Sequence, residues 1–142
     1  MICRRYSMKK TCFAQLILVL YVAAVVYVCF GHIDSDQMPL RSLFGLEADK
    51  LVHGVLFLPF SILVYYSFGS RSANVFESVG IALGLFIVGA AAAAATEYFQ
   101  GFTTYRQSDI HDFYADMVGL GVSSLFVMAA DISRHVKKRG RR

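Results

Sequence analysis

The most distinctive feature of the chain is residues 13–30, FAQLILVLYVAAVVYVCF, in which no side chain is charged. A hydrocarbon core about 30 Å thick requires roughly 20 apolar residues in a helix. These residues therefore predict a membrane-spanning helix. A basic segment precedes the stretch, as in a signal peptide, but the stretch is longer than a cleavable hydrophobic region and ends in bulky residues rather than small ones. We expect it to be an uncleaved anchor.

Three more apolar stretches follow, at residues 51–68, 79–95 and 113–130. The chain of 142 residues is one domain in length, and a composition of 56% hydrophobic and 17% charged residues leaves too little charge to cover a soluble surface. The sequence therefore predicts an all-α membrane protein, a four-helix transmembrane bundle within a lipid bilayer. We place the membrane domain at residues 13–130, between basic tails at residues 1–12 and 131–142.

Lys and Arg are concentrated at both ends of the chain, with four in residues 1–12 and six in residues 131–142. By contrast, residues 32–50 contain four acids against two basic residues, and residues 96–112 contain three acids against Arg106. Because cytoplasmic segments carry the excess of Lys and Arg, we predict a bacterial inner-membrane protein with both termini in the cytoplasm. The basic tails then suit anionic lipid, and we expect no nucleic-acid partner.

The three cysteines, Cys3, Cys12 and Cys29, are odd in number and form no CxxC pair. Their spacing does not match that of a metal site, and a disulfide is disfavoured for residues that face a reducing cytoplasm. We interpret all three as small apolar residues. We expect neither a metal site nor a cofactor.

Small residues indicate which helices pack closely, because membrane helices associate where small side chains let backbones approach. Gly80 and Gly84 form a GxxxG pair in the third stretch, and Ala115 and Gly119 are four apart in the fourth. We therefore expect these two stretches to lie backbone to backbone at the centre of the bundle. The first two stretches would then have more contact with lipid.

Ionisable residues lie between and within the last two stretches, where they are costly and usually paired or functional. Glu97 and Gln100 are three apart and share a helix face, as do Asp109, Asp112 and Asp116 if a helix begins near Ser108. Ser108 would cap that helix, and Asp109 would suit the positive end of its dipole. Asp116 lies two turns in and needs a partner. Arg106 is the obvious one, because its guanidinium can hold a carboxylate bidentately. We expect Arg106 to neutralise the acidic cluster, with Asp112 as its preferred partner.

A second polar group opens the second stretch, where Asp49, Lys50 and His53 share one helix face. Asp49 could fix the tautomer of His53, and Lys50 could mark the membrane interface. In the predicted topology both polar groups open on the outer side. We therefore predict one outward-facing pocket formed by His53, Glu97, Gln100, Arg106 and Asp112.

The order and spacing of these residues resemble the VanZ-like family of small bacterial membrane proteins. The resemblance covers about residues 48–121 and rests on the pattern Asp49-Lys50-x-x-His53, Glu97-x-x-Gln100, Arg106, Asp112, a polar residue four further on, and Gly119. Where the family usually has Asn, this chain has Asp116. The resemblance implies a cell-envelope protein, associated with antibiotic resistance towards glycopeptides of the teicoplanin type, and an envelope precursor or a glycopeptide as its partner.

Two classes of function remain open. In an enzyme, His53 and Glu97 would act as acid and base, Arg106 or Lys50 would hold an anionic group, and Asp112 is a further candidate, in phosphoryl or acyl transfer on a lipid-linked envelope substrate. No GxSG, SxxK or DxxDG motif supports a particular reaction, although three aspartates could hold Mg²⁺. In a non-catalytic module, the same charges would neutralise one another and bind an envelope component.

Overall fold

A computed structural model of the protein describes residues 2–31, 42–43, 46–68, 72–103 and 109–139. These residues form five helices and two short strands: α1 (Ile2–Phe30), β1 (Ser42–Leu43), β2 (Leu46–Glu47), α2 (Ala48–Phe57), α3 (Phe60–Phe68), α4 (Val75–Gln100) and α5 (Ile110–Arg139). The strands pair antiparallel, with Ser42 opposite Glu47. This pair was not expected from the sequence, but it is only two residues long on each side and leaves the protein all-α in its architecture.

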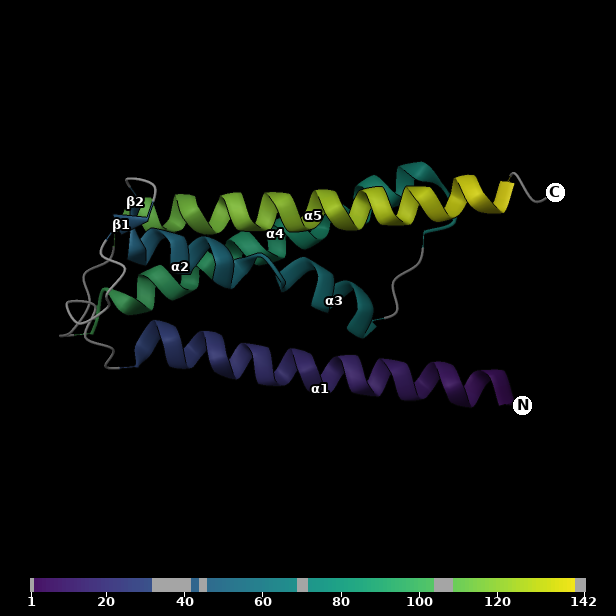
Figure 1. Ribbon diagram of the computed structural model, residues 1–142, viewed down its shortest axis with the longest axis horizontal. Helices are drawn as coiled ribbons and strands as arrows, with labels where there is room; N and C mark the ends of the chain where they lie inside the picture. The colour runs from purple at the N-terminus through teal and green to yellow at the C-terminus, as the bar shows by residue number, and fades with distance from the viewer. Residues whose placement is uncertain (1, 32–41, 44–45, 69–71, 104–108, 140–142) are drawn as a thin grey trace.

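Four segments of the described chain are long and apolar enough to cross a membrane: Thr11–Phe30, Lys50–Phe68, Val75–Gln100 and Ile110–Lys137. The prediction of a four-helix transmembrane bundle is confirmed (Figure 1). The helices of the third and fourth spans, α4 and α5, extend beyond the predicted apolar stretches. Asn74 caps the start of α4, because its side chain accepts a hydrogen bond from the Glu77 amide at 2.9 Å. Polar residues at both ends of α4 and α5 therefore belong to the helices.

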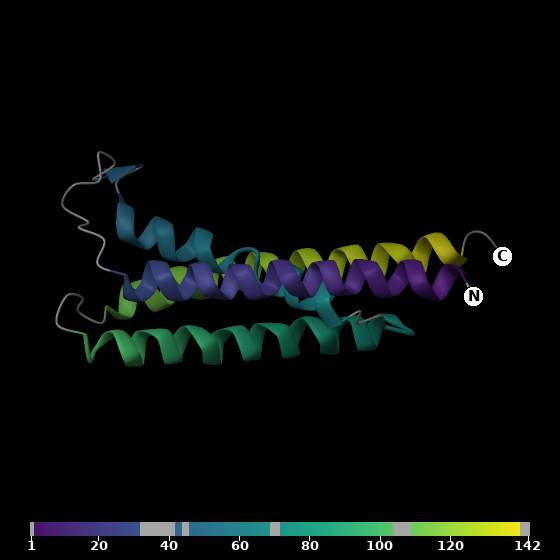
Figure 2. The ribbon, with the colours of Figure 1, turned by 90° about the horizontal axis from the view of Figure 1, so that it is seen from below.

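Both chain termini lie at one end of the bundle, which we call the terminal end (Figures 1 and 2). At the opposite end, which we call the distal end, α1 and α4 finish and α2 and α5 begin. Chain segments that are far apart in the sequence therefore meet at the distal end.

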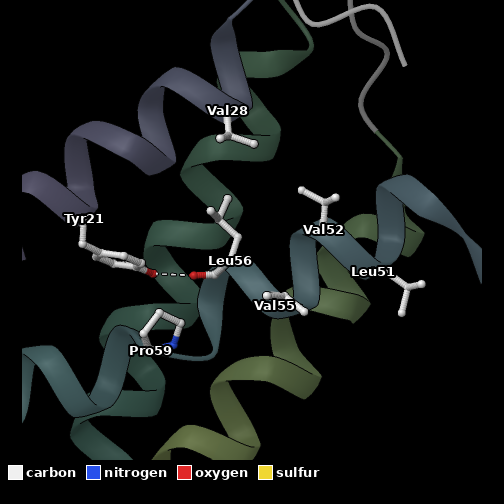
Figure 3. A pocket seen from close by; sticks show the side chains of 7 residues that line it. All are labelled: Tyr21, Val28, Leu51, Val52, Val55, Leu56 and Pro59. Atoms are coloured by element: carbon white, nitrogen blue, oxygen red, sulfur yellow. Dashed lines mark hydrogen bonds between the residues drawn. The ribbon is translucent and has the colours of Figure 1, made fainter. Parts of the chain in front are cut away.

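The second span is interrupted at Pro59, between the end of α2 and the start of α3. Proline has no amide hydrogen, and its ring clashes with the carbonyl group one turn earlier, so it breaks a helix. A freed carbonyl group within a bilayer needs a partner from the protein. Tyr21 of α1 supplies one, because its hydroxyl donates a hydrogen bond to the Leu56 carbonyl oxygen at 2.8 Å (Figure 3).

The centre of the bundle is formed by α5 with α2 and α4, the two helices that it contacts most. A Cβ atom at Gly119 of α5 would collide with the carbonyl oxygen of Gly54 on α2, and one at Gly89 of α4 would collide with Leu120 of α5. By contrast, apart from the adjoining residues and backbone of α4 itself, no described atom lies within 4 Å of a Cβ built at Gly80 or Gly84. The expectation that this GxxxG pair mediates close packing is wrong, because both glycines face open space.

The expected distribution of lipid contact is also wrong for the second span. In the 18-residue apolar window of the second and of the fourth span 33% of the residues are buried, against 11% in that of the first and 17% in that of the third. The second span is central because Gly54 and the break at Pro59 let it lie directly on α5. The first span lies at one side of the bundle, where α1 packs mainly against α3 (Figure 1).

A hydrogen-bond network around Asp131 ties the helices together near the terminal end. Its carboxylate accepts hydrogen bonds from Tyr65 of α3 at 2.6 Å and from Ser78 of α4 at 3.0 Å. Ser72 also donates to this carboxylate, and Arg134 donates to the Tyr65 hydroxyl oxygen at 3.2 Å. These bonds satisfy a carboxylate that is 3% exposed, and they connect three spans.

Candidate functional site

Four ionisable side chains are buried together near the distal end. They come from three helices: His53 from α2, Glu97 from α4, and Asp112 and Asp116 from α5. None of them is more than 7% exposed. The site exists because these helices begin or end at the distal end, with His53 in the second turn of α2 and Glu97 in the last turn of α4. We call these four residues the distal site.

The imidazole of His53 is oriented by Asp116. Its Nδ1 lies 3.2 Å from Oδ1 of Asp116, which is fully buried. When Asp116 is ionised its carboxylate can only accept a hydrogen bond, so Nδ1–H of His53 donates and the lone pair of the neutral imidazole lies on Nε2. This Nε2 atom lies 3.9 Å from Oδ2 of Asp112. The distal site therefore holds an oriented base that faces a second carboxylate.

Glu97 completes the arrangement from the third helix. A ring nitrogen of His53, a carboxylate oxygen of Glu97 and a carboxylate oxygen of Asp112 all lie within 4.8 Å of one another. Nitrogen and carboxylate oxygens at this separation can exchange protons with a bound group or coordinate a cation. The arrangement is suited to acid–base chemistry and to binding a polar or charged ligand.

The other residues that the sequence assigned to the pocket do not belong to the distal site as the structure describes it. Gln100 is buried, and its side-chain amide donates a hydrogen bond to the Cys29 carbonyl oxygen at 2.9 Å, so it joins the end of α4 to the end of α1. Lys50 lies in the first turn of α2 and is partly buried. Arg106 and the side chain of Asp49 lie outside the described residues. Their roles as anion holder and tautomer-fixing group remain predictions.

The expected partner of Asp116 was Arg106, whereas the contact observed for its carboxylate is with His53. Sequence reasoning missed this pair because the two residues are 63 positions apart. One signal could have indicated it. Each of the two residues is a polar group one or two helical turns inside an apolar stretch that begins at the distal end. The two residues therefore lie at a similar depth in the bundle.

Asp109 has a structural role at the start of α5. Its carboxylate accepts a hydrogen bond from the His111 amide at 2.9 Å, and its carbonyl oxygen accepts one from the Asp112 amide at 2.9 Å. This is helix capping, the role that the sequence analysis assigned to Ser108, which lies outside the described residues. The cap starts α5 so that Asp112 and Asp116, four residues apart, share one face.

An apolar groove lies between α1 and α2, the helix that also carries His53 of the distal site. It has a volume of about 400 Å³ and is lined by Tyr21, Val28, Leu51, Val52, Val55, Leu56 and Pro59 (Figure 3). Of the lining residues, Val52 directly precedes His53 in the sequence, and Leu51 lies two positions before it. The groove is suited to a hydrocarbon chain, because its lining is almost entirely apolar.

The chain matches the model of a known protein family. The family model described as VanZ/LLP1 matches residues 16–131, which is more than half of the chain and includes every described residue of the distal site. Neither a curated protein nor a solved structure matches the chain.

Proposed function

The chain belongs to the VanZ/LLP1 family of membrane proteins, and on this premise we propose that it contributes to resistance against glycopeptides of the teicoplanin type. The family is associated with teicoplanin resistance. In the proposed function, the distal site binds or modifies a component of the bacterial cell envelope. The observation that carries the proposal is the buried distal site itself, since four ionisable groups within an apolar bundle are costly to retain without a use.

The proposed orientation places the distal site on the outer face of the cytoplasmic membrane. Both tails are rich in Lys and Arg, and they leave the bundle at the terminal end. Because such residues are retained in the cytoplasm, the distal end would face the envelope. Glycopeptides and the last precursors of the cell wall are found on that side.

The proposed ligand is lipid-linked, with a polar head at the distal site and a hydrocarbon chain in the groove between α1 and α2. The lining of the groove fits an apolar chain, and His53 lies on the helix that forms one of its walls. A ligand of this kind would enter sideways from the bilayer. Its polar head would exchange hydrogen bonds with Glu97, Asp112 and the imidazole.

A membrane-embedded enzyme is the second candidate, favoured by the contact between His53 and Asp116. A carboxylate that holds an imidazole in one tautomer is a recurrent arrangement in general acid–base catalysis. In this version His53 Nε2 takes a proton from the attacking group, and Glu97 or Asp112 returns one to the leaving group. The substrate would be a lipid-linked phosphate or acyl compound.

The proposal is tested by producing the protein in a glycopeptide-susceptible bacterium and measuring the minimum inhibitory concentration of teicoplanin. The wild-type protein should raise it above that of cells with an empty vector. His53→Ala should remove the increase, because it deletes the imidazole at the centre of the distal site. His111→Ala is the matched control, since this histidine lies at the same end of the bundle but is exposed.

Immunoblots of membrane fractions should show equal amounts of the three proteins. A His53→Ala protein that still protects cells as well as the wild type would refute a role for the distal site. To separate the two versions, purified protein in lipid is incubated with lipid-linked cell-wall precursors. Release of phosphate or acyl groups that depends on His53 favours the enzyme, and binding without turnover favours the non-catalytic module.

A further inference from the structure

We propose that His53, Glu97 and Asp112 bind a divalent transition-metal ion, with Zn²⁺ as the best-suited metal, and that Asp116 orients His53 for this purpose. No metal site was expected from the sequence, in which His53, Glu97 and Asp112 lie far apart. The inference deepens the proposed function and rests on it only for the biological use of the metal. Metal binding itself is measured on the purified protein without antibiotic or precursor.

The donor set fits the proposed metal. One imidazole nitrogen and two carboxylate oxygens are common ligands of zinc, whereas Mg²⁺ and Ca²⁺ prefer oxygen alone. Metal–ligand bonds of about 2.0–2.2 Å place neighbouring ligand atoms of a tetrahedral site roughly 3.4 Å apart. The three ligand atoms here lie within 4.8 Å of one another, and His53 Nε2 lies 3.9 Å from Asp112 Oδ2. Shifts of less than about 1 Å would close the site around an ion.

A second and independent observation is the way in which His53 is held. A histidine that binds a metal usually donates its other ring N–H group to a carboxylate or carbonyl oxygen, which fixes the tautomer and turns the lone pair towards the metal. In this protein Asp116 Oδ1 lies 3.2 Å from His53 Nδ1, and His53 Nε2 lies on the side of Asp112, 3.9 Å from its Oδ2 atom. The contacts thus run from the Asp116 carboxylate to the His53 imidazole and from the imidazole to the side of the remaining ligands, which is the order found in metal centres.

The charge of the site points in the same direction. Glu97, Asp112 and Asp116 are at most 7% exposed and lie around one imidazole at the edge of a membrane domain. Carboxylates in such a place are stabilised by nearby positive charge, which a metal ion can supply in addition to the contacts that Glu97 and Asp112 already make. A divalent ion bound by Glu97 and Asp112 is formally neutral with its two carboxylates. Arg106, which lies outside the described residues, is the competing cation, and the experiment below separates the two.

Three protein ligands leave a fourth coordination position for a ligand from outside. A metal at this position polarises a phosphoryl or carbonyl oxygen. The polar head of the proposed lipid-linked component would therefore carry such a group. Its hydrocarbon chain would remain in the groove beside α2, which is lined by Val52 and Leu56 among others.

The experiment uses the full-length protein purified in detergent. The protein is treated with a chelator, loaded with ZnCl₂ or CoCl₂, separated from unbound ions and analysed for metal by mass spectrometry. We expect an equimolar amount of zinc. The cobalt form should show the visible absorption of a tetrahedral or five-coordinate ion with a nitrogen ligand, because the His53 imidazole and two carboxylates occupy the coordination sphere.

Variants identify the ligands. Glu97→Gln, Asp112→Asn and His53→Ala should each abolish stoichiometric binding. Asp109→Asn and His111→Ala are matched controls from the same end of the bundle and should bind as the wild type, because Asn also caps a helix and His111 is exposed. Gel filtration checks that every variant is folded.

Asp116 is tested as a positioning residue by two substitutions. Asp116→Asn keeps an oxygen that can accept from His53 Nδ1–H, so binding should persist with a modest loss. Asp116→Leu removes the acceptor and should weaken zinc binding by about 10–100-fold. The cobalt spectrum should shift in the Leu variant but not in the Asn variant.

Binding by the wild type that is no stronger than by a Glu97→Gln, Asp112→Asn double variant would overturn the proposal. If Arg106 occupies the site instead, the wild type will bind no metal and Arg106→Gln will create or increase binding, which also overturns it. Teicoplanin protection in cells is recorded separately. A protein that protects cells without binding metal refutes this inference alone, and one that binds metal without protecting cells refutes the proposed function alone.

Discussion

Two buried carboxylates on α5, Asp116 and Asp131, differ in how their oxygens are satisfied. Both oxygens of Asp131 accept hydrogen bonds, from Tyr65 on one side and from Ser72 and Ser78 on the other. Oδ2 of Asp116 is buried and has no hydrogen-bond partner among the residues that the structure describes. Buried polar atoms in proteins are nearly always paired, and an exception calls for an explanation. We interpret Asp131 as a structural residue and Asp116 as part of a working site.

The structural role of Asp131 leads to a prediction for Tyr65. Tyr65→Phe removes the hydroxyl that donates to Asp131 at 2.6 Å and leaves a buried carboxylate short of one donor. We expect the free energy of unfolding in detergent to fall by about 1–3 kcal/mol. Thermal or denaturant unfolding, followed by circular dichroism, measures the change.

Tyr27→Phe is the matched control, because Tyr27 is 70% exposed on α1. It should leave the melting temperature unchanged. Equal stability of the Tyr65→Phe variant and the wild type would show that Asp131 does not depend on this hydroxyl. Teicoplanin protection should be retained in both variants when they are equally abundant in the membrane, because Asp131 belongs to the other end of the bundle.

Among the helices, close packing is concentrated where α2 crosses α5. Gly119 faces the Gly54 carbonyl group, and Gly54 in turn faces the backbone of Ala115. This contact holds α2 against the first turns of α5, so it sets the distance between His53 and Asp116. Packing of small residues thus supports the distal site directly, because membrane helices gain their association energy from such contacts.

This contact predicts the effect of alanine at two glycines. Gly119→Ala places a methyl group against the Gly54 carbonyl oxygen and should separate α2 from α5. We expect a loss of at least about 1–3 kcal/mol, as in other overpacked contacts. Gly84→Ala meets open space and should be neutral or stabilising by about 0.5–1 kcal/mol, because alanine favours a helix over glycine.

Unfolding in detergent compares the two variants with the wild type. The Gly119→Ala variant should also lose teicoplanin protection, since it moves His53 away from Asp116. A Gly119→Ala protein as stable as Gly84→Ala would mean that α2 and α5 do not approach as closely as described.

For the protein as a whole, an even number of spans places both termini on one side and the distal site on the other. The basic tails predict that the shared side of the termini is the cytoplasm. Fusions to alkaline phosphatase, which is active outside the cytoplasm, and to green fluorescent protein, which fluoresces inside, measure the orientation.

A fusion after Arg142 should fluoresce and lack phosphatase activity. An insertion between residues 32 and 41 should show the reverse. Phosphatase activity at the C-terminal position would invert the bundle and place the distal site in the cytoplasm, which would exclude an outward-facing envelope site. Removing the Lys and Arg residues of the C-terminal tail should weaken the preference for one orientation.

The number of spans, the limits of the first two spans to within two residues and the family could be recognised in the sequence. The reason is that the bilayer acts as an external solvent of fixed thickness, so each apolar stretch is recognised from its own length and composition. Some residues of the distal site could also be recognised in the sequence, because Glu97 and Asp112 are polar groups beside apolar stretches.

The partners within the bundle could not be recognised in this way. The pairing of His53 with Asp116, the close contact of Gly54 with Gly119 and the open space at Gly80 depend on which helix faces which, and at what rotation. Hydrophobicity does not distinguish a neighbouring helix from lipid, because both are apolar. Those choices follow from the shapes and hydrogen bonds of residues more than sixty positions apart, which come together only when the helices have packed.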